Sequence, residues 1–288
     1  MTEQTTSIAW GPAGQPAAIG ITFDNLGEAM EITNGLWPAD TPVGAHPSVM
    51  RTLPAVLDVL DELALPATYF AEGWSAGVYP NALGRLVAAG HEVAYHGWLH
   101  EHWSGLEDRD RESELIRRGV EAMAERGIRM RGFRPPGGGM TPWTVELARE
   151  HGFTYLSPAA RRTGLLADDL VALPFIWTAI DAYYAWDAFA PLRRQLGDPD
   201  EVLPAGRMVD AMVATIDATV ADGGCLTLLF HPFLLGEVER FEAMREVLTH
   251  LAGRDDVWCA TCAELADWAL GQRTTIARDP QLDERSWR

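Results

Sequence analysis

The sequence predicts an α/β fold, a distorted (β/α) barrel with seven or eight mostly parallel strands. Short apolar runs alternate with amphipathic helical segments, and neither a shift in composition nor a long Pro/Gly-rich linker divides the chain. At 288 residues the chain is long enough to bury a substantial core in one large domain. We therefore predict one barrel over residues 17–272, a flexible N-terminal segment at 1–16 and a C-terminal tail at 273–288.

Each predicted strand is a short apolar run, and each predicted helix has apolar residues three and four positions apart. In chain order the predicted strands are 17–23, 66–70, 91–96, 131–134, 153–157, 169–177, 224–230 and 256–261. The predicted helices are 48–63, 81–89, 107–126, 142–151, 207–221, 238–251 and 264–271. Gly90 and Gly152 follow the last residues of two of these helices, as is typical of helix ends. Residues 28–47 are predicted to form a long loop, and such loops are often functional.

The charge balance restricts the classes of partner. The chain has 41 acidic and 23 basic residues, a formal charge of −18, which argues against nucleic acid or an anionic membrane as a partner. No stretch approaches the roughly 20 apolar residues of a membrane helix, and the N-terminus lacks the features of a secretory signal. Three cysteines cannot form a full disulfide framework, so we expect reduced structural thiols, including the C-x-x-C at Cys259 and Cys262. A cytoplasmic location is expected.

Polar residues follow several of the predicted strands. Because the carboxyl ends of parallel strands share one face of a barrel, residues that are distant in sequence are expected to converge there. These residues are Asp24, His96, His100, Arg134, Asp181 and His231.

The residue types suggest a role for each position. His96 and His100 are four residues apart, a spacing that suits a divalent metal, most simply zinc; two structural histidines are the alternative. Arg134 precedes two prolines and is expected to pair with a buried acid, for which Asp24 is available. Gly137 then has the first free backbone N–H, positioned to stabilise an oxyanion. His231 is either a core histidine or a general acid.

Taken in order, these residues resemble the polysaccharide deacetylase family, the NodB-homology domain of carbohydrate esterase family four. The family motif T-F-D-D-G corresponds to TFDNL at 22–26, and H-(S/T)-x-x-H corresponds to HGWLH at 96–100. R-x-P-x-G corresponds to RPPGG at 134–138, and His231 follows an apolar strand as in the family. The segments 173–184 and 231–251 are similar to the branch that contains allantoinase-like proteins and cytosolic deacetylases.

The resemblance implies metal-dependent hydrolysis of an N-acetyl group. Asp24 would take a proton from water, Arg134 would hold Asp24, and His231 would protonate the leaving amine. Asp181 would orient His231 or Arg134, and Asp187 is a second candidate for that place. The implied cofactor is a divalent metal, with zinc first and cobalt, manganese and nickel as alternatives.

The resemblance fails at one position that matters for the metal. The second acid of T-F-D-D-G, a metal ligand in the family, is Asn25 here, and the next residue is Leu26. Asn25 could bind through its carbonyl oxygen, Asp24 or Glu28 could move into the ligand set, or the site could work without a metal. In the first case, Asn25→Asp is expected to raise metal affinity. At Gly137 polymer-active members often carry a tyrosine, so we also expect a reshaped pocket.

Three functions stay open on the sequence alone. The first is N-deacetylation of an acetylated amino sugar or another small amide, with a small molecule or oligosaccharide as substrate. The second is hydrolysis of a cyclic amide or imide, and the third is a catalytically silent binding protein. The sequence leaves a homo-oligomer open as well.

Overall fold

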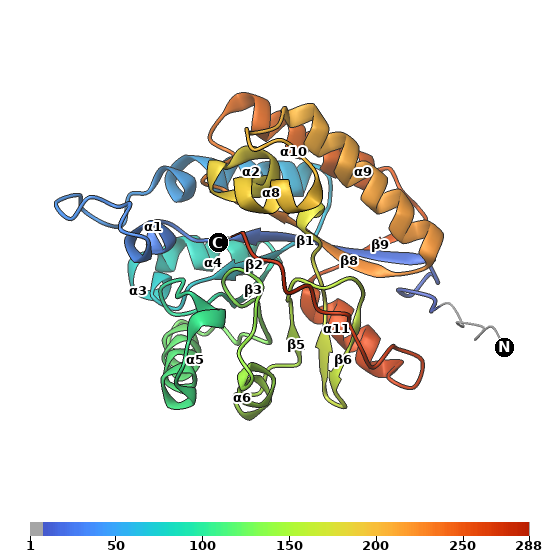
Figure 1. The fold of residues 1–288 in the computed structure, drawn as a ribbon, viewed down its shortest axis with the longest axis horizontal. Helices are drawn as coiled ribbons and strands as arrows, with labels where there is room; N and C mark the ends of the chain where they lie inside the picture. Colours follow the sequence, from blue (N-terminus) through green and yellow to red (C-terminus); the bar gives the residue numbers. More distant parts are fainter. Residues whose placement is uncertain (1–7, 288) are drawn as a thin grey trace.

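One curled sheet forms the centre of the molecule (Figure 1). The computed structural model describes residues 8–287, and in this part of the chain the sheet has nine strands. The strands are β1 (Ala17–Asp24), β2 (Thr68–Ala71), β3 (Glu92–Tyr95), β4 (Gly132–Phe133), β5 (Tyr155–Leu156), β6 (Gly164–Ala167), β7 (Leu170–Ala172), β8 (Cys225–Phe230) and β9 (Val257–Cys259).

The strand order is that of a barrel left partly open. The strands pair in the order β6-β7-β5-β4-β3-β2-β1-β8, and β9 pairs with the start of β1. All pairings are parallel except that of β6 with β7. The two edges of the sheet approach each other where the Thr227 N–H of β8 donates to the Pro174 carbonyl at 2.9 Å. The predicted distorted barrel of mostly parallel strands is confirmed.

Helices cover the outside of the sheet. They are α1 (Ala29–Thr33), α2 (Leu53–Glu62), α3 (Ser75–Val78), α4 (Pro80–Ala88), α5 (Arg109–Ala124), α6 (Thr144–Glu150), α7 (Asp181–Ala185), α8 (Ala190–Leu196), α9 (Ala205–Asp222), α10 (Val238–Ala252) and α11 (Cys262–Gly271). Figure 1 shows α9 and α10 along one side of the molecule and α5 and α6 on the opposite side. The side chain of Thr261 accepts from the Glu264 N–H in a capping box, which explains why α11 begins there.

Several parts of the described chain differ from the sequence-based expectation, and the short helices α1, α3, α7 and α8 were not predicted. The hairpin strand β6 was missed, because its four residues lie between turn residues and pair locally with β7. The C-terminal segment, predicted as a tail, packs along the barrel: Ala277 O accepts from the Leu165 N–H at 2.7 Å, and the Asp283 N–H donates to Ala159 O at 2.9 Å. This segment therefore ends beside the carboxyl ends of the strands.

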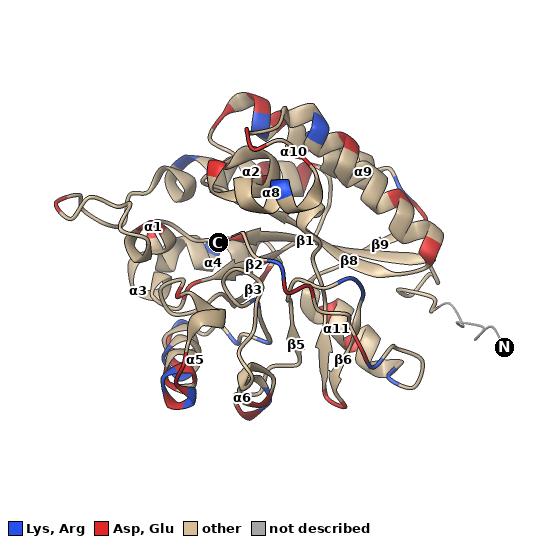
Figure 2. Cartoon of the chain, in the orientation of Figure 1, with Lys and Arg blue, Asp and Glu red and all other residues tan. Residues whose placement is uncertain are grey.

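The charged residues lie mainly on the outer elements. Figure 2 shows acidic residues on α5, α6, α9 and α10, where they are interspersed with arginines on α5 and α10. By contrast, all eight residues of β1 and all six of β8 are buried. No helix in the described range 8–287 is long and apolar enough to cross a membrane. Most charged residues are thus on the surface, and the few ionisable groups buried inside the barrel, such as Asp24 and Arg134, need a separate explanation.

Candidate active site

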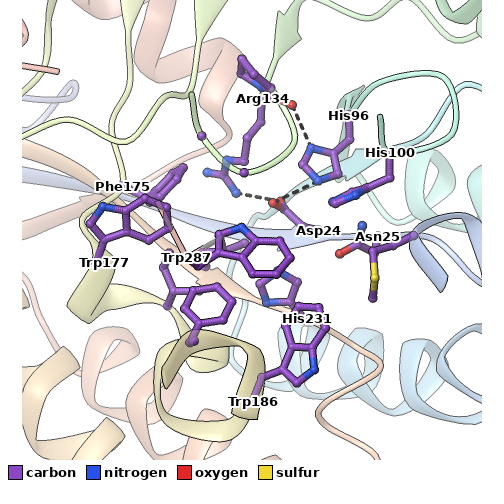
Figure 3. Close-up of a pocket in the computed structure, with 17 residues that line it drawn as sticks. Asp24, Asn25, His96, His100, Arg134, Phe175, Trp177, Trp186, His231 and Trp287 are labelled. Carbon is purple, nitrogen blue, oxygen red and sulfur yellow. Dashed lines mark hydrogen bonds and ion pairs between the residues drawn. The ribbon is translucent and has the colours of Figure 1, made fainter. Parts of the chain in front are cut away.

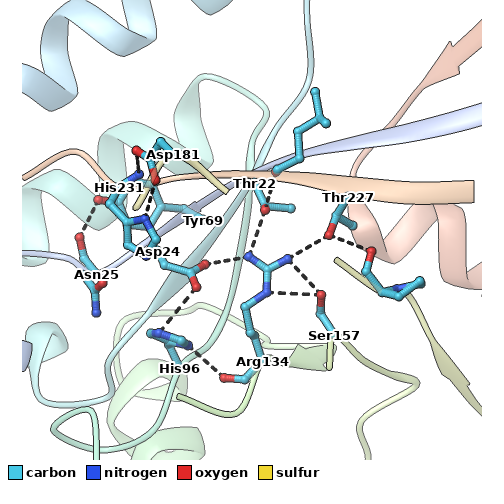
Figure 4. A network of polar contacts seen from close by, with 12 residues as sticks. Thr22, Asp24, Asn25, Tyr69, His96, Arg134, Ser157, Asp181, Thr227 and His231 are labelled. Carbon is cyan, nitrogen blue, oxygen red and sulfur yellow. Dashed lines mark hydrogen bonds and ion pairs between the residues drawn. The ribbon is translucent and has the colours of Figure 1, made fainter. Parts of the chain in front are cut away.

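Arg134 is the centre of a buried polar network at the carboxyl ends of the strands (Figure 4). Its side chain is 1% exposed, and its Nη1 donates to Asp24 Oδ1 at 2.7 Å and to Thr22 Oγ1 at 2.8 Å. Nε and Nη2 donate to Ser157 Oγ at 3.1 and 2.8 Å, and Nη2 also donates to Thr227 Oγ1 at 3.0 Å. A buried guanidinium needs this many acceptors, because every N–H left unpaired would retain its desolvation cost. The network therefore holds the Asp24 side chain in one orientation.

His96 lies on the other side of Asp24 and is a neutral imidazole. Its Nε2 is 3.5 Å from Asp24 Oδ2, and its Nδ1 is 2.8 Å from the Arg134 carbonyl oxygen. Burial, aided by the charge of Arg134, lowers the pKa of His96 to about 3. A carbonyl only accepts, so Nδ1 bears the proton and donates, and Nε2 keeps its lone pair. A ring nitrogen fixed in this way is typical of a metal ligand.

His100 and Asn25 complete this side of the site (Figure 3). The rings of His96 and His100 are 5.0 Å apart, and His100 is 6% exposed. Both His100 and Asn25 have positive φ, 61° and 69°. Asparagine and histidine tolerate this left-handed conformation better than most residues. The turns after β1 and β3 thus direct both residues into the same pocket.

His231 and Asp181 form a second acid–histidine pair. His231 Nδ1 is 2.6 Å from Asp181 Oδ1, and the His231 backbone N–H donates to Asp181 Oδ2 at 2.7 Å. Burial alone would lower the pKa of His231, but the charge and hydrogen bond of Asp181 outweigh it, so the pKa is raised above its ordinary value. Nδ1 is engaged by Asp181, which leaves Nε2 for a group in the pocket.

These residues converge on one pocket with about 440 Å3 of empty space. Its polar lining comprises Asp24, Asn25, His96, His100, Arg134 and His231. Its apolar lining comprises Met30, Phe175, Trp177, Ile180, Trp186, Phe189, Leu229 and Trp287. Figure 3 shows Phe175, Trp177 and Trp287 on one side of Asp24, with His96, His100 and Asn25 on the other. The pocket is thus a polar end joined to an aromatic wall, as in many sites for small ligands.

Gly137 lies at the edge of this pocket in a conformation that favours glycine. Its φ is 78°, and an added Cβ would lie 3.5 Å from Nε1 of Trp287. The neighbouring Gly138 N–H donates to Pro135 O at 2.8 Å and closes the turn. Trp287 therefore lies next to Gly137 at the edge of the pocket.

Two alternatives drawn from the sequence are wrong. Asp187 is exposed, and Asp181 is the acid that contacts His231. Glu28 is buried away from the pocket lining: its Oε1 accepts from the Gly44 N–H at 2.6 Å, and its Oε2 accepts from the Tyr79 hydroxyl. Glu28 therefore anchors the long loop after β1 and does not reach the histidines.

The metal question depends on a small set of donors. Among residues 8–287, no group of three or more His, Cys, Asp and Glu side chains is arranged to hold a metal ion. Two imidazoles do fit, because His96 presents a lone pair at Nε2 and His100 lines the same pocket. Further ligands would have to be Asp24, which already binds Arg134, or the neutral amide of Asn25.

A comparison with protein-family models matches the polysaccharide deacetylase model over residues 13–156, half of the chain. The chain belongs to the polysaccharide deacetylase family. This family is generally metal-dependent. The match includes Asp24, His96, His100 and Arg134, whose geometry is described above.

Characterised relatives of the family match shorter stretches. A peptidoglycan deacetylase from Helicobacter pylori is 32% identical over 109 residues, 36% of this chain and 35% of that protein. A chitooligosaccharide deacetylase from Sinorhizobium fredii is 43% identical over 77 residues, 27% of this chain and 33% of that protein. The chain thus spans about a third of the length of these two relatives.

Solved structures match almost the whole chain. A Mycobacterium smegmatis protein described as a candidate polysaccharide deacetylase superposes with a TM-score of 0.81 at 29% identity, covering 98% of both chains. The PuuE allantoinase superposes with a TM-score of 0.74 at 16% identity, covering 93% of this chain and 95% of that one. The second likeness shows a shared fold alone.

Sequence reasoning missed several residues of the site. Ser157 is the last residue of the predicted strand 153–157, and Glu72 comes two residues after the predicted strand 66–70, so a polar residue at a strand end was a signal for both. Trp287 had no such signal. Glu72 is fully buried behind Asn25, and burial raises its pKa to about 7 despite hydrogen bonds from Leu26 and Asn25 that lower it.

Proposed function

We propose that the protein removes the acetyl group from a small N-acetylated amino sugar by hydrolysis. The observation that carries this proposal is the presence of an acceptor and a donor in one pocket: the Asp24 side chain held by Arg134, and His231, whose pKa is raised by its contact with Asp181. Amide hydrolysis needs a base for the attacking water and an acid for the leaving nitrogen. Deacetylases of sugars among the family relatives supply the substrate class.

The chain's own residues then divide the proton transfers. Asp24 Oδ2 takes a proton from the attacking water, while Oδ1 stays bound to Arg134 and keeps the carboxylate in place. His231 gives its Nε2 proton to the departing amine, and Asp181 stabilises the imidazolium before that transfer. The Gly137 N–H, on the pocket rim, is the backbone donor proposed for the developing oxyanion.

A divalent metal is part of the proposal, with zinc as the first choice because imidazoles suit it. Cobalt, manganese and nickel are the alternatives. His96 and His100 would hold it, joined by oxygen from Asn25 or Asp24. When bound, such a metal supplies Lewis acidity toward the acetyl carbonyl and the attacking water.

The aromatic wall favours a short substrate. Trp287 lies parallel to Phe189, with an angle of 2° between the rings and 5.3 Å between their centroids, and 5.2 Å from Trp186. A second small hollow, lined by His102, Ser104 and Ser286, lies on the other side of Trp287. The C-terminal segment, through Trp287, thus forms part of the aromatic wall and leaves less room for a long polymer.

The test is a substrate panel read by acetate release. Purified protein is given N-acetylglucosamine, its β-1,4 oligomers, and cyclic ureides and imides, after chelation and after separate addition of zinc, cobalt, manganese or nickel. Acetate release from the shortest acetylated sugars is expected, and it should disappear on chelation. Ring opening of the cyclic compounds without acetate release would instead establish the cyclic-amide function. Turnover of none of them, under every metal condition, would contradict both.

A further inference from the structure

A buried carboxylate clamps the residue at which the family motif fails. Asn25 Nδ2 donates to Glu72 Oε1 at 2.7 Å, and the Leu26 N–H donates to Glu72 Oε2 at 2.9 Å. Glu72 is 0% exposed and follows β2, so the contact joins the ends of two neighbouring strands. The clamp therefore involves both oxygens of one carboxylate and two consecutive residues of the turn after β1.

The clamp determines which end of the Asn25 amide is available to the pocket. A carboxylate only accepts hydrogen bonds, so the NH2 group of the amide must face Glu72 and Oδ1 must point elsewhere. The backbone is also held, because the Tyr69 hydroxyl donates to Asn25 O at 2.8 Å. In the described part of the chain no hydrogen bond is made to Oδ1, and Asn25 lines the pocket with His96 and His100.

We propose that Glu72 is a positioning residue that holds Asn25 with its amide oxygen toward the metal side of the pocket, so that a neutral ligand replaces the acid of the family motif. The inference rests on the metal included in the proposed function. The family motif has its negative charge at position 25. Here the negative charge is on Glu72, which contacts position 25 from the side away from the pocket. An amide that could rotate freely would present NH2, which cannot bind a cation, about as readily as oxygen.

The same contact predicts how substitutions at the two positions depend on each other. Asn25→Asp alone would bring two carboxylates to about hydrogen-bond distance in a buried place, where like charges repel strongly. The gain in metal affinity expected from the sequence is therefore not expected of this single change. Glu72→Gln alone would leave the amide oxygen on the fixed Leu26 N–H and turn its NH2 group toward Asn25. Asn25 would then rotate, and its own NH2 would face the pocket.

The double variant restores a consistent set of donors and acceptors. In Asn25→Asp/Glu72→Gln, the glutamine oxygen accepts from the Leu26 N–H and its NH2 group donates to the new aspartate. The second aspartate oxygen then faces the pocket as an anionic ligand. Metal affinity is expected to be lower than wild type in each single variant and at least as high as wild type in the double variant.

The experiment measures zinc affinity without substrate, by competition with a chromophoric chelator. Glu72→Gln should weaken binding about 10- to 100-fold, the usual range for the loss of a partner that orients a ligand. The visible spectrum of the cobalt-loaded protein should change in the same variant and change again in the double variant. Glu112→Gln is the matched control, because Glu112 is equally buried but binds Trp103 and Thr144 away from the pocket.

An affinity of Glu72→Gln within twofold of wild type, or a double variant no tighter than the two single variants, would overturn the inference. If Glu72→Gln does not fold, Asn25→Ala decides, since unchanged zinc affinity in that variant removes Asn25 from the ligand set. Wild-type protein that binds no zinc also overturns the inference. Acetate release by wild-type protein is a separate measurement, so failure of this inference is distinguishable from failure of the proposed function.

Discussion

Two buried aspartate–histidine pairs meet at the same pocket, and their histidines have opposite protonation tendencies. In the pair of Asp24 with His96, the pKa of the histidine is lowered to about 3. In the pair of Asp181 with His231, the pKa of the histidine is raised. Both histidines are buried, so burial by itself does not explain the difference.

The difference lies in what else each aspartate binds. Asp24 already forms an ion pair with the guanidinium of Arg134 at 2.7 Å. The His96 Nδ1–H donates a hydrogen bond to the neutral carbonyl of Arg134. Within residues 8–287, Asp181 accepts only the backbone N–H of His231 besides its contact with His231 Nδ1 at 2.6 Å. A neighbouring acid therefore raises the pKa of a histidine, and makes it a proton donor near neutral pH, only when that acid does not already form an ion pair with a stronger cation. The predictions below test this contrast in order of decreasing effect.

Asp24→Asn should have the largest effect. It removes the proposed base and leaves the buried Arg134 without its counter-ion. We expect kcat for acetate release to fall about 1,000-fold and the free energy of unfolding to fall by about 3 kcal/mol. Steady-state kinetics and urea unfolding measure the two effects, with circular dichroism to verify folding. Turnover within tenfold of wild type would exclude Asp24 as the base.

His96→Ala should abolish tight metal binding. It removes the imidazole whose lone pair is fixed by the Arg134 carbonyl, and we expect zinc affinity to fall by at least about 100-fold. Metal content of the purified protein and competition titration measure this. His91→Ala, which changes a histidine outside the pocket lining, should keep wild-type affinity. Equal metal content in the two variants would contradict the assignment.

Asp181→Asn should change the pH dependence of the reaction. The acid form of His231 is lost as pH rises through its raised pKa, so the alkaline limb of the pH–rate profile reports this group. Without the charge of Asp181 that pKa falls, and the alkaline limb should move toward lower pH. We also expect kcat at neutral pH to fall about 10- to 100-fold. Asp187→Asn, a change at the exposed acid six residues later, is the control and should leave the profile unchanged.

The same pair contributes to stability with a defined sign. Because the pKa of folded His231 is raised, its stabilisation is fully present below the unfolded pKa of about 6.5 and is lost as pH rises through the folded pKa. Asp181→Asn should therefore destabilise the protein more at about pH 6 than at about pH 9. Urea unfolding at the two pH values measures the difference, and an equal loss at both would contradict the charge-based coupling.

Ser157→Ala should have the smallest effect. It removes the acceptor shared by Nε and Nη2 of Arg134, which keeps its bonds to Asp24 and Thr227. We expect a loss of about 1–3 kcal/mol in the free energy of unfolding and less than tenfold in kcat/KM. Thr227→Val is the matched comparison and should cost less, because Nη2 then still has Ser157. A larger loss of unfolding free energy in Thr227→Val than in Ser157→Ala would show that Thr227 is the more important acceptor for Arg134.

The sequence alone determined the fold class and located the polar residues of the pocket. Apolar runs and helical spacing are local signals, and they predicted the barrel and the strand ends that carry Asp24, Arg134 and His231. The motif order then led to the family, which the comparisons established. These features could be predicted because each depends on a few neighbouring residues and on the rule that the carboxyl ends of parallel strands lie on one face of the barrel.

Only the tertiary structure decided which groups those residues contact. Asp181, rather than Asp187, is the acid that contacts His231, as its hydrogen bonds to this residue 50 positions away in the sequence show. Glu72 was placed against Asn25 across 47 positions, and Trp287 was brought into the pocket by a segment predicted as a tail. No local pattern encodes such contacts, because they depend on the packing of whole strands and on how the charge of each buried group is balanced. The family motif locates the site, but these distant partners determine the protonation of its histidines and the orientation of Asn25.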